Sequence, residues 1–80
     1  MTDVTVDHDS GDYVYEQVAR ILRNRIESGQ YPPGRIMPSA RTLSQELEVS
    51  IGSVKHALEQ LRADGLVETR IGRGMVVIGR

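Results

Sequence analysis

Apolar side chains recur three and four positions apart after a polar beginning, which is the spacing of one face of a helix. The members of this stripe are Val14, Val18, Ile21, Leu22 and Ile26. The spacing predicts a helix over residues 13–28. Gly29 follows directly, and glycine often ends a helix because it adopts the left-handed backbone conformation at little cost.

Two shorter apolar patterns with the same period follow. They consist of Leu43 and Leu47 in the first and of Val54, Ala57, Leu58 and Leu61 in the second. The sequence predicts a helix capped at Ser39 that ends near residues 47–48, and a helix capped at Ser50 that ends near residue 63. Two such helices, packed through their apolar faces, form a helix-turn-helix whose second helix is free to enter the major groove of DNA.

A β-hairpin with a basic, glycine-flanked tip is predicted over residues 65–77, around Gly72-Arg73-Gly74. Side chains two apart share one face of a strand, so we expect Leu66 to face inward. Residues 35–37 follow a rigid Pro-Pro-Gly turn and are expected to form a very short strand that pairs with this hairpin. The order of elements predicts an α+β, mainly α fold: a three-helix winged helix-turn-helix with a C-terminal β-hairpin wing.

Charge is distributed unevenly along the 80 residues, whose formal net charge is −1. Residues 1–12 contain four Asp and no Lys or Arg, so the remaining 68 residues, with ten basic and seven acidic groups, carry a net charge of +3. We expect residues 1–11 to be a disordered acidic tail, solvated or in competition with DNA, and residues 12–80 to form one domain. A surplus of +3 is small for phosphate binding, so the position of the basic groups matters more than their number.

Composition excludes several classes of protein. The chain has no Cys, and His8 and His56 are isolated, so we expect no disulfide, no metal and no cofactor. It has no Ser-His-Asp or Cys-His set, so an enzyme is not expected. No apolar run reaches membrane-spanning length and the acidic start is unlike a signal peptide, so we expect no membrane partner and a cytoplasmic location.

Seven short motifs stand in a fixed order between Tyr15 and Val77, and their order and spacing are more specific than any one of them. They are Tyr15-Glu16-Gln17-Val18, Ile26-Glu27-Ser28-Gly29-Gln30-Tyr31-Pro32-Pro33-Gly34, Met37-Pro38-Ser39-Ala40-Arg41, Leu47-Glu48-Val49-Ser50, Ala57-Leu58 through Leu61, Gly65-Leu66-Val67 and Gly72-Arg73-Gly74. Together they resemble the N-terminal DNA-binding domain of the GntR family of bacterial transcription regulators. The resemblance implies a regulator that is associated with the bacterial nucleoid when it is bound to DNA.

Three positions depart from the pattern of that family. Ala40 stands where its members usually carry Glu, Ile51 where they carry an Arg that commonly reads guanine, and Lys55 where they carry another Arg. Family members also typically continue into a larger effector-binding or dimerising domain. The given sequence stops at Arg80, so we expect neither such a domain nor a small-molecule effector. Dimer contacts would then come from the first helix, the tail or the wing, or would form only on DNA.

The resemblance and the residue types together give a set of candidate DNA contacts. They are Arg41, Ser50, Ile51, Gly52, Ser53, Lys55, His56, Arg70, Gly72, Arg73 and Gly74. The first turn of the helix capped at Ser50 offers free N–H groups and the positive end of the helix dipole to a phosphate. Arginine suits phosphate or guanine bidentately, and a small cationic wing tip suits a narrow minor groove.

An ordinary structural role is the alternative for each of these residues. Arg41 could pair with Glu46 or Glu48, and the glycines could serve only bends and turns. Lys55 and His56 could be solvated, whereas contact of His56 with a phosphate would make binding pH-dependent. The basic residues of the first helix, which we expect to solubilise it rather than to touch phosphate, are Arg20, Arg23 and Arg25.

The leading interpretation is a sequence-specific transcriptional regulator, acting as a repressor, that binds double-stranded DNA as a homodimer on an inverted repeat. The alternative is a winged-helix protein-interaction or assembly module without a specific DNA site, which the near-neutral charge, the acidic tail and Ile51 in place of arginine favour. Clustering on one face would support DNA binding, and scattered charges would support the alternative. The basic groups that decide are Arg41, Lys55, Arg70 and Arg73.

Ile51 leaves two interpretations open. Its side chain could pack on a thymine methyl group, or it could turn inward and fasten the start of its helix to the core. If Ile51 faces DNA, we expect selected binding sites to favour A·T at the position that it contacts.

Overall fold

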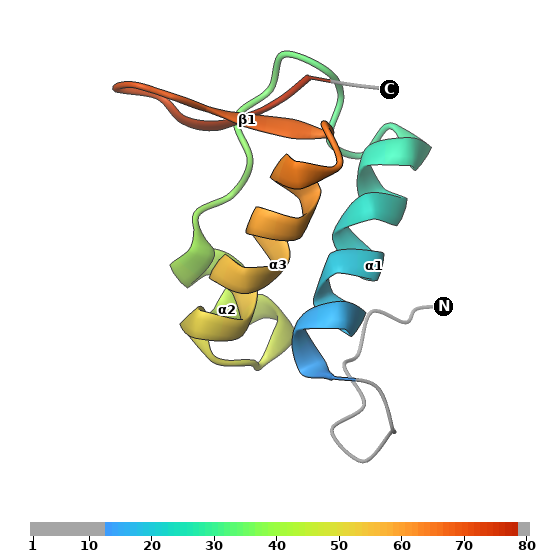
Figure 1. Cartoon of the computed structure of the whole chain (residues 1–80), viewed down its shortest axis with the longest axis vertical. Helices are drawn as coiled ribbons and strands as arrows, with labels where there is room; N and C mark the ends of the chain where they lie inside the picture. The colour runs from blue at the N-terminus through green and yellow to red at the C-terminus, as the bar shows by residue number, and fades with distance from the viewer. Residues whose placement is uncertain (1–12, 79–80) are drawn as a thin grey trace.

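The computed structural model describes residues 13–78 of the chain, so the predicted tail over residues 1–11 lies outside the described residues. Three helices precede a two-stranded antiparallel sheet (Figure 1). The elements are α1 (Val14–Ser28), α2 (Ala40–Leu47), α3 (Ile51–Ala63), β1 (Val67–Arg70) and β2 (Gly74–Val77). This order confirms the predicted winged helix-turn-helix. No helix within residues 13–78 combines the length and the hydropathy needed to cross a membrane.

The first helix begins one residue later than the sequence predicted. Tyr13 is its N-cap, with an extended backbone at φ −64° and ψ 146°, and α1 starts at Val14. Gly29 ends the helix as predicted. It adopts φ +91°, and its N–H donates a hydrogen bond to the carbonyl of Ile26. A residue with a Cβ would be strained at that φ, so glycine is required where α1 stops.

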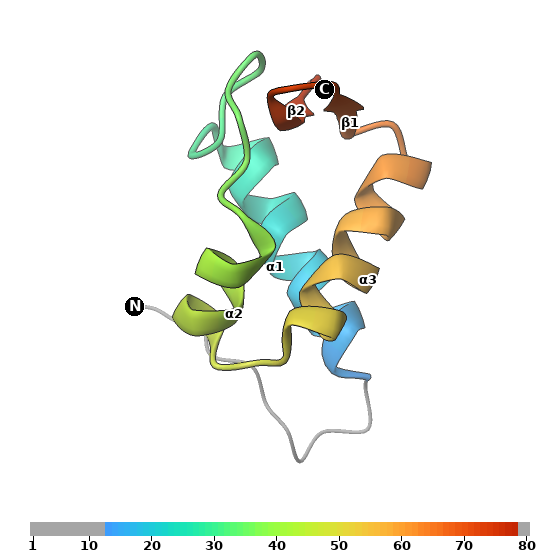
Figure 2. The ribbon, with the colours of Figure 1, turned by 90° about the vertical axis from the view of Figure 1, so that its left-hand side faces the viewer.

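α1 and α2 each pack against α3, which stands on the right in Figure 2. The residues that these helices and the sheet bury completely are apolar. The largest of them are Leu22, Leu43, Leu61, Val18, Val54, Val67 and Val77. Because the apolar stripes predicted for the three helices all meet in this cluster, one small core holds both helices of the helix-turn-helix and the base of the wing.

The hairpin is anchored to the segment that leads into α2. β1 and β2 pair in the register Val67↔Val77 to Arg70↔Gly74. On the other side of β2, Ile36 forms an isolated bridge with Val76, and the N–H of Met37 donates to the carbonyl of Met75 over 2.7 Å. The short strand predicted over residues 35–37 is therefore present as this bridge, and it fixes the base of the wing beside the start of α2.

Arg25 departs most from the sequence-based expectation. It was expected to be solvent-exposed on α1, but it is buried. Its exposed fraction is 7%. Nη1 and Nη2 donate to Oε1 and Oε2 of Glu46 over 3.2 and 2.6 Å, and Nη1 also donates to Oη of Tyr31 over 2.7 Å. Hydrogen bonding to Glu46 raises the pKa of the Arg25 guanidinium above its ordinary value, while burial opposes the change. Arg25 thus ties α1 to α2.

The turn between α2 and α3 depends on a residue with a left-handed backbone. Glu48 adopts φ 58° and ψ 47°, and within residues 13–78 it alone among the non-glycine residues has a positive φ. Its N–H donates to the carbonyl of Ser44. This conformation costs a residue with a Cβ about 1 kcal/mol or more relative to glycine, so the turn is made at some expense of stability.

Replacing Arg25 by Ala should lower the free energy of unfolding by about 1–3 kcal/mol, because it removes a partly buried ion pair and leaves Tyr31 and Glu46 without their donor. Urea denaturation followed by circular dichroism measures this change. Arg62→Ala is the matched control, because Arg62 pairs with Glu59 on the surface, and this variant should unfold almost like the parent. Equal stabilities for the two variants would show that the Arg25 pair contributes nothing.

Replacing Glu48 by Gly should raise the free energy of unfolding by about 0.5–1 kcal/mol, because glycine adopts the left-handed turn without steric cost. Glu48→Ala keeps the Cβ and removes the carboxylate, so it should bring no comparable gain. Thermal unfolding of both variants separates the backbone effect from the charge effect. A gain that is the same in both would assign the effect to the charge.

Candidate nucleic-acid interface

The start of α2, the start of α3 and the tip of the wing lie on one side of the molecule, which is the left-hand side in Figure 1 and faces the viewer in Figure 2. We call this side the winged face and define it by residues 39–41, 50–55 and 70–74. A cavity of about 320 Å³ lies between the start of α2 and the wing, and its lining includes Ser39 and Ala40 of the former and Arg73 and Gly74 of the latter. The winged face therefore brings together three segments that are distant in the sequence.

Ser39 is the N-cap of α2, as the sequence predicted. Its Oγ accepts a hydrogen bond from the N–H of Thr42 over 3.1 Å, and its hydroxyl donates to Oγ1 of Thr42 over 3.0 Å. Arg41 is exposed in the same turn. The alternative that Arg41 pairs with Glu46 is wrong, because Glu46 is bound by Arg25. Within residues 13–78 Arg41 has no ion-pair partner, so its charge is available to a ligand.

The start of α3 repeats this capping arrangement. Ser50 accepts from the N–H of Ser53 over 3.0 Å and donates to its Oγ over 3.0 Å, so the predicted cap is confirmed and both hydroxyls are engaged with each other. Gly52 is exposed, and a Cβ there would meet only Oγ of Ser50, at 3.9 Å. No protein atom fills that space, so the absence of a side chain at Gly52 leaves the backbone at the start of α3 accessible from outside.

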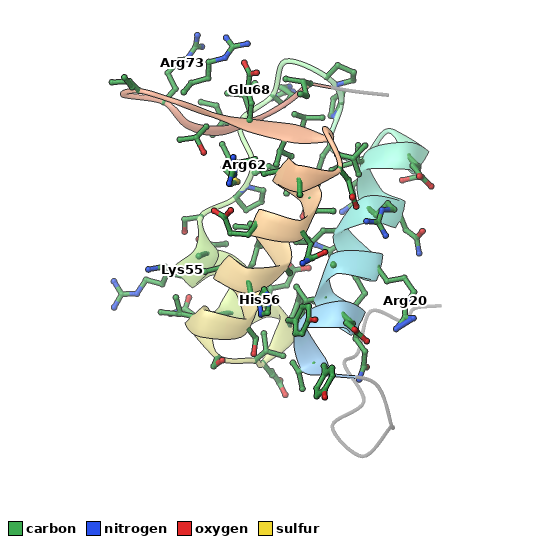
Figure 3. The ribbon with its side chains drawn as sticks, in the orientation of Figure 1. Arg20, Lys55, His56, Arg62, Glu68 and Arg73 are labelled. Atoms are coloured by element: carbon green, nitrogen blue, oxygen red, sulfur yellow. The ribbon has the colours of Figure 1, made fainter. Side chains whose placement is uncertain are left out.

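Ile51 is directed outward. Its exposed fraction is 42%, and it is outside the hydrophobic core cluster, so the interpretation in which it fastens the helix to the core is wrong. Ile51 and Lys55 are four residues apart and therefore share one side of α3. Lys55 extends toward the left in Figure 3, the side on which the wing tip also lies. The first two turns of α3 thus present an apolar and a cationic side chain together.

His56 lies against α1 instead of pointing freely into solvent. Its ring stacks on the ring of Tyr15, with centroids 3.7 Å apart and planes inclined by 13°. Tyr15 stacks in turn on Tyr13 at 5.9 Å. The helical pattern gave no sign of this contact, because the partner ring comes from a different helix. Of the predicted neighbours Lys55 and His56, only Lys55 is without a side-chain partner in the part of the chain that the structure describes.

The tip of the wing is a tight turn in which the N–H of Arg73 donates to the carbonyl of Arg70 over 3.1 Å. Gly72 and Gly74 have φ of +79° and +96°, which other residues rarely adopt, so the glycines of the tip are required by the turn. Arg70 is held by Glu68 in an ion pair along β1. Residues two apart share a strand face, so the spacing of Glu68 and Arg70 in the sequence already indicates this pair.

Three basic residues of the winged face have no ion-pair partner within residues 13–78. They are Arg41 of α2, Lys55 of α3 and Arg73 of the wing. Lys55 and Arg73 both lie on the left in Figure 3, whereas Arg20 lies on the right, beyond α1. Arg62 is paired with Glu59. Arg35, whose carbonyl accepts from the N–H of Val77 at the base of the wing, is the fourth basic residue without an ion-pair partner in the described part of the chain. Three of these four positive charges therefore lie on the winged face, as the DNA-binding interpretation requires.

The fold and this face are those of a winged helix-turn-helix DNA-binding domain, in which an exposed helix and a basic hairpin lie side by side. A family model described as bacterial regulatory proteins, gntR family, matches residues 14–77. The chain belongs to this family, which confirms the resemblance seen in the sequence. It carries the DNA-binding domain of a GntR-type transcription regulator.

Relatives with curated names are regulators. The chain is 42% identical over 64 residues to the uncharacterized HTH-type transcriptional regulator YdfD of Bacillus subtilis, covering 80% of this chain and 13% of YdfD. It is 38% identical over 65 residues to the Exu regulon transcriptional regulator of Escherichia coli strain K12, covering 81% of this chain and 25% of that protein. The chain thus spans a quarter or less of the length of these relatives.

Solved structures of the same family are also similar. YtrA from Sulfolobus acidocaldarius, a GntR-family transcription factor, superposes with a TM-score of 0.86 at 28% identity, covering 99% of this chain and 83% of YtrA. The DNA-binding domain of AraR in complex with operator ORX1 gives a TM-score of 0.74 at 28% identity, covering 79% of this chain and 76% of that chain.

Replacing Glu68 by Gln should strengthen binding to duplex DNA about two- to fivefold at low salt, because it frees Arg70 from its ion pair and removes a negative charge beside the wing tip. Fluorescence anisotropy with a labelled duplex measures the change. Glu27→Gln on α1 is the control, since it changes the net charge equally. An equal gain in both variants would attribute the effect to net charge and leave Arg70 outside the interface.

Proposed function

We propose that the chain acts as a sequence-specific transcriptional repressor, with α3 in the major groove of its operator and the wing in the adjacent minor groove. The observation that carries this proposal is the meeting of the unpaired Arg41, Lys55 and Arg73 on the winged face. Each comes from a different element, so a single duplex can engage all three. An operator occupied in this way is unavailable to other proteins, which is how binding alone represses.

In this arrangement α3 supplies the base contacts. Ile51 packs on a thymine methyl group, and Lys55 reaches a neighbouring base or phosphate. The missing side chain at Gly52 lets the DNA backbone approach the first turn of α3, where free N–H groups and the helix dipole favour a phosphate. Arg41, in the first turn of α2, anchors the same strand through a phosphate. His56 is left out of this interface because its ring is stacked on Tyr15.

The wing supplies the second groove contact. Its glycines keep the tip narrow, and Arg73 adds a positive charge that a narrow A·T-rich minor groove attracts. One domain of this size makes few contacts, so we propose that two copies bind an inverted repeat, each copy raising the effective concentration of the other. The complex of the AraR DNA-binding domain with an operator supports DNA as the ligand of this fold.

Selection of binding sites from random duplex DNA tests the proposal directly. We expect an enriched inverted repeat with A·T at the position that Ile51 contacts. On that site, Lys55→Ala and Arg73→Ala should each weaken binding and lower the dependence of log K on log salt by about one unit. Arg20→Ala is the matched control, because Arg20 lies on the opposite side of the molecule, and its binding should remain close to that of the parent (Figure 3).

The outcome also separates the two classes of function. If no motif is enriched and the three variants lose affinity equally, the winged face has no specific operator. The chain would then be a winged-helix interaction or assembly module, and its partners would be proteins. Analytical ultracentrifugation with and without the selected duplex shows whether two copies assemble before or on the DNA.

A further inference from the structure

The most exposed apolar side chain in the described part of the molecule lies at the apex of the wing. Ile71 is 101% exposed, which means that it gains nothing from folding. The other large apolar side chains with substantial exposure reach between 42% and 70%. A hairpin turn is normally made of small or polar residues, so an isoleucine at this position has no structural explanation.

The local geometry leaves Ile71, and not an arginine, at the tip. Ile71 and Gly72 are the two central residues of the turn that the N–H of Arg73 closes onto the carbonyl of Arg70. Arg70 is drawn back along β1 by its ion pair with Glu68. Arg73 follows Gly72 and lines the cavity beside α2. The tip therefore consists of an apolar side chain with one unpaired cation behind it.

We propose that Ile71 is the residue that reads the minor groove, by packing on its floor and rejecting the 2-amino group of guanine. The proposal rests on the function proposed above, in which the wing enters that groove. The floor of the minor groove differs between A·T and G·C in one donor, the amino group on C2 of guanine. An apolar side chain cannot accept a hydrogen bond from that donor, and the amino group also fills the space that the side chain would occupy.

A contact of Ile71 with the floor of the minor groove gives the domain a defined base-pair preference. A·T and T·A present the same acceptors in the minor groove, so Ile71 should accept both orientations and disfavour both G·C and C·G. Arg73 alone would act differently, because a cation responds to the width and the potential of the groove rather than to one amino group. Chemically altered base pairs, tested against a variant of each residue, distinguish the two.

The experiment uses the duplex obtained by site selection, with the A·T pairs under the wing replaced by G·C or by inosine·C. Inosine is guanine without the 2-amino group, so it keeps the major-groove pattern of G·C and removes only the minor-groove donor. For the parent protein we expect G·C to weaken binding about five- to twentyfold, a cost of the usual size for one base pair, and inosine·C to be accepted about as well as A·T. In Ile71→Ala the penalty for G·C should fall below about threefold, while affinity for the A·T site decreases.

Two controls make the result decisive. Ile78→Ala removes another exposed isoleucine, which is 43% exposed and lies at the opposite end of the hairpin, and it should keep the full penalty. Arg73→Ala should lower affinity for every duplex while it keeps the preference for inosine·C over G·C. Because Ile71 contributes nothing to the core, thermal unfolding of Ile71→Ala should match that of the parent.

The outcomes separate the two proposals. If the parent selects no site, the DNA-binding function fails and this inference fails with it. If the parent selects a site but Ile71→Ala still rejects G·C as strongly as the parent, the function stands and the role of Ile71 is overturned. Equal rejection of inosine·C and G·C by the parent would also overturn it, because the discrimination would then come from the major groove.

Discussion

The bidentate ion pair between Arg25 and Glu46 holds the helix-turn-helix in place against the rest of the molecule. α1 and α2 both pack mainly on α3, and this ion pair adds a direct side-chain link between α1 and α2 to the apolar core that they share. Tyr31 accepts a further hydrogen bond from the same guanidinium, which ties in the turn after α1. Because Arg41 stands at the start of α2, this link to α1 also helps to position the Arg41 charge that the proposed function assigns to DNA.

Within residues 13–78, four of the nine basic residues are engaged in ion pairs inside the molecule, Arg25 among them. Arg23 pairs with Asp64, Arg62 with Glu59 and Arg70 with Glu68. This internal pairing explains why a chain with a formal charge of −1 can still present a positive surface. Within residues 13–78, three of the four basic residues without an ion-pair partner, Arg41, Lys55 and Arg73, lie on the winged face, and the fourth is Arg35. A surface of this kind should bind DNA weakly without sequence contacts, so base and groove recognition must supply much of the affinity.

Local patterns predicted the fold well, whereas contacts between elements escaped sequence reasoning. The helical stripes, the serine caps and the glycine that ends α1 are set by residues within one turn of one another, and each was confirmed. The role predicted for Arg25 was wrong, because its partner Glu46 is 21 residues away in the sequence. The stacking of His56 was missed because its partner ring belongs to α1. The Glu68–Arg70 pair was within reach, since the two residues share one strand face. The sequence left the direction of Ile51 open, because an isoleucine next to a helix cap can face either the core or the solvent. Its exposure in the structure shows that it faces outward.

The bridge between Ile36 and Val76 has a consequence for the length of the operator. Only two residues separate Ile36 from the cap of α2 at Ser39, so the wing and the helix-turn-helix are joined through a very short piece of backbone. The distance between the two groove contacts proposed above is then set by the domain itself. One base pair inserted between these contacts would displace them by about 3.4 Å and rotate them by about 34°, so half-sites of altered length should be rejected even when every contacted base is kept.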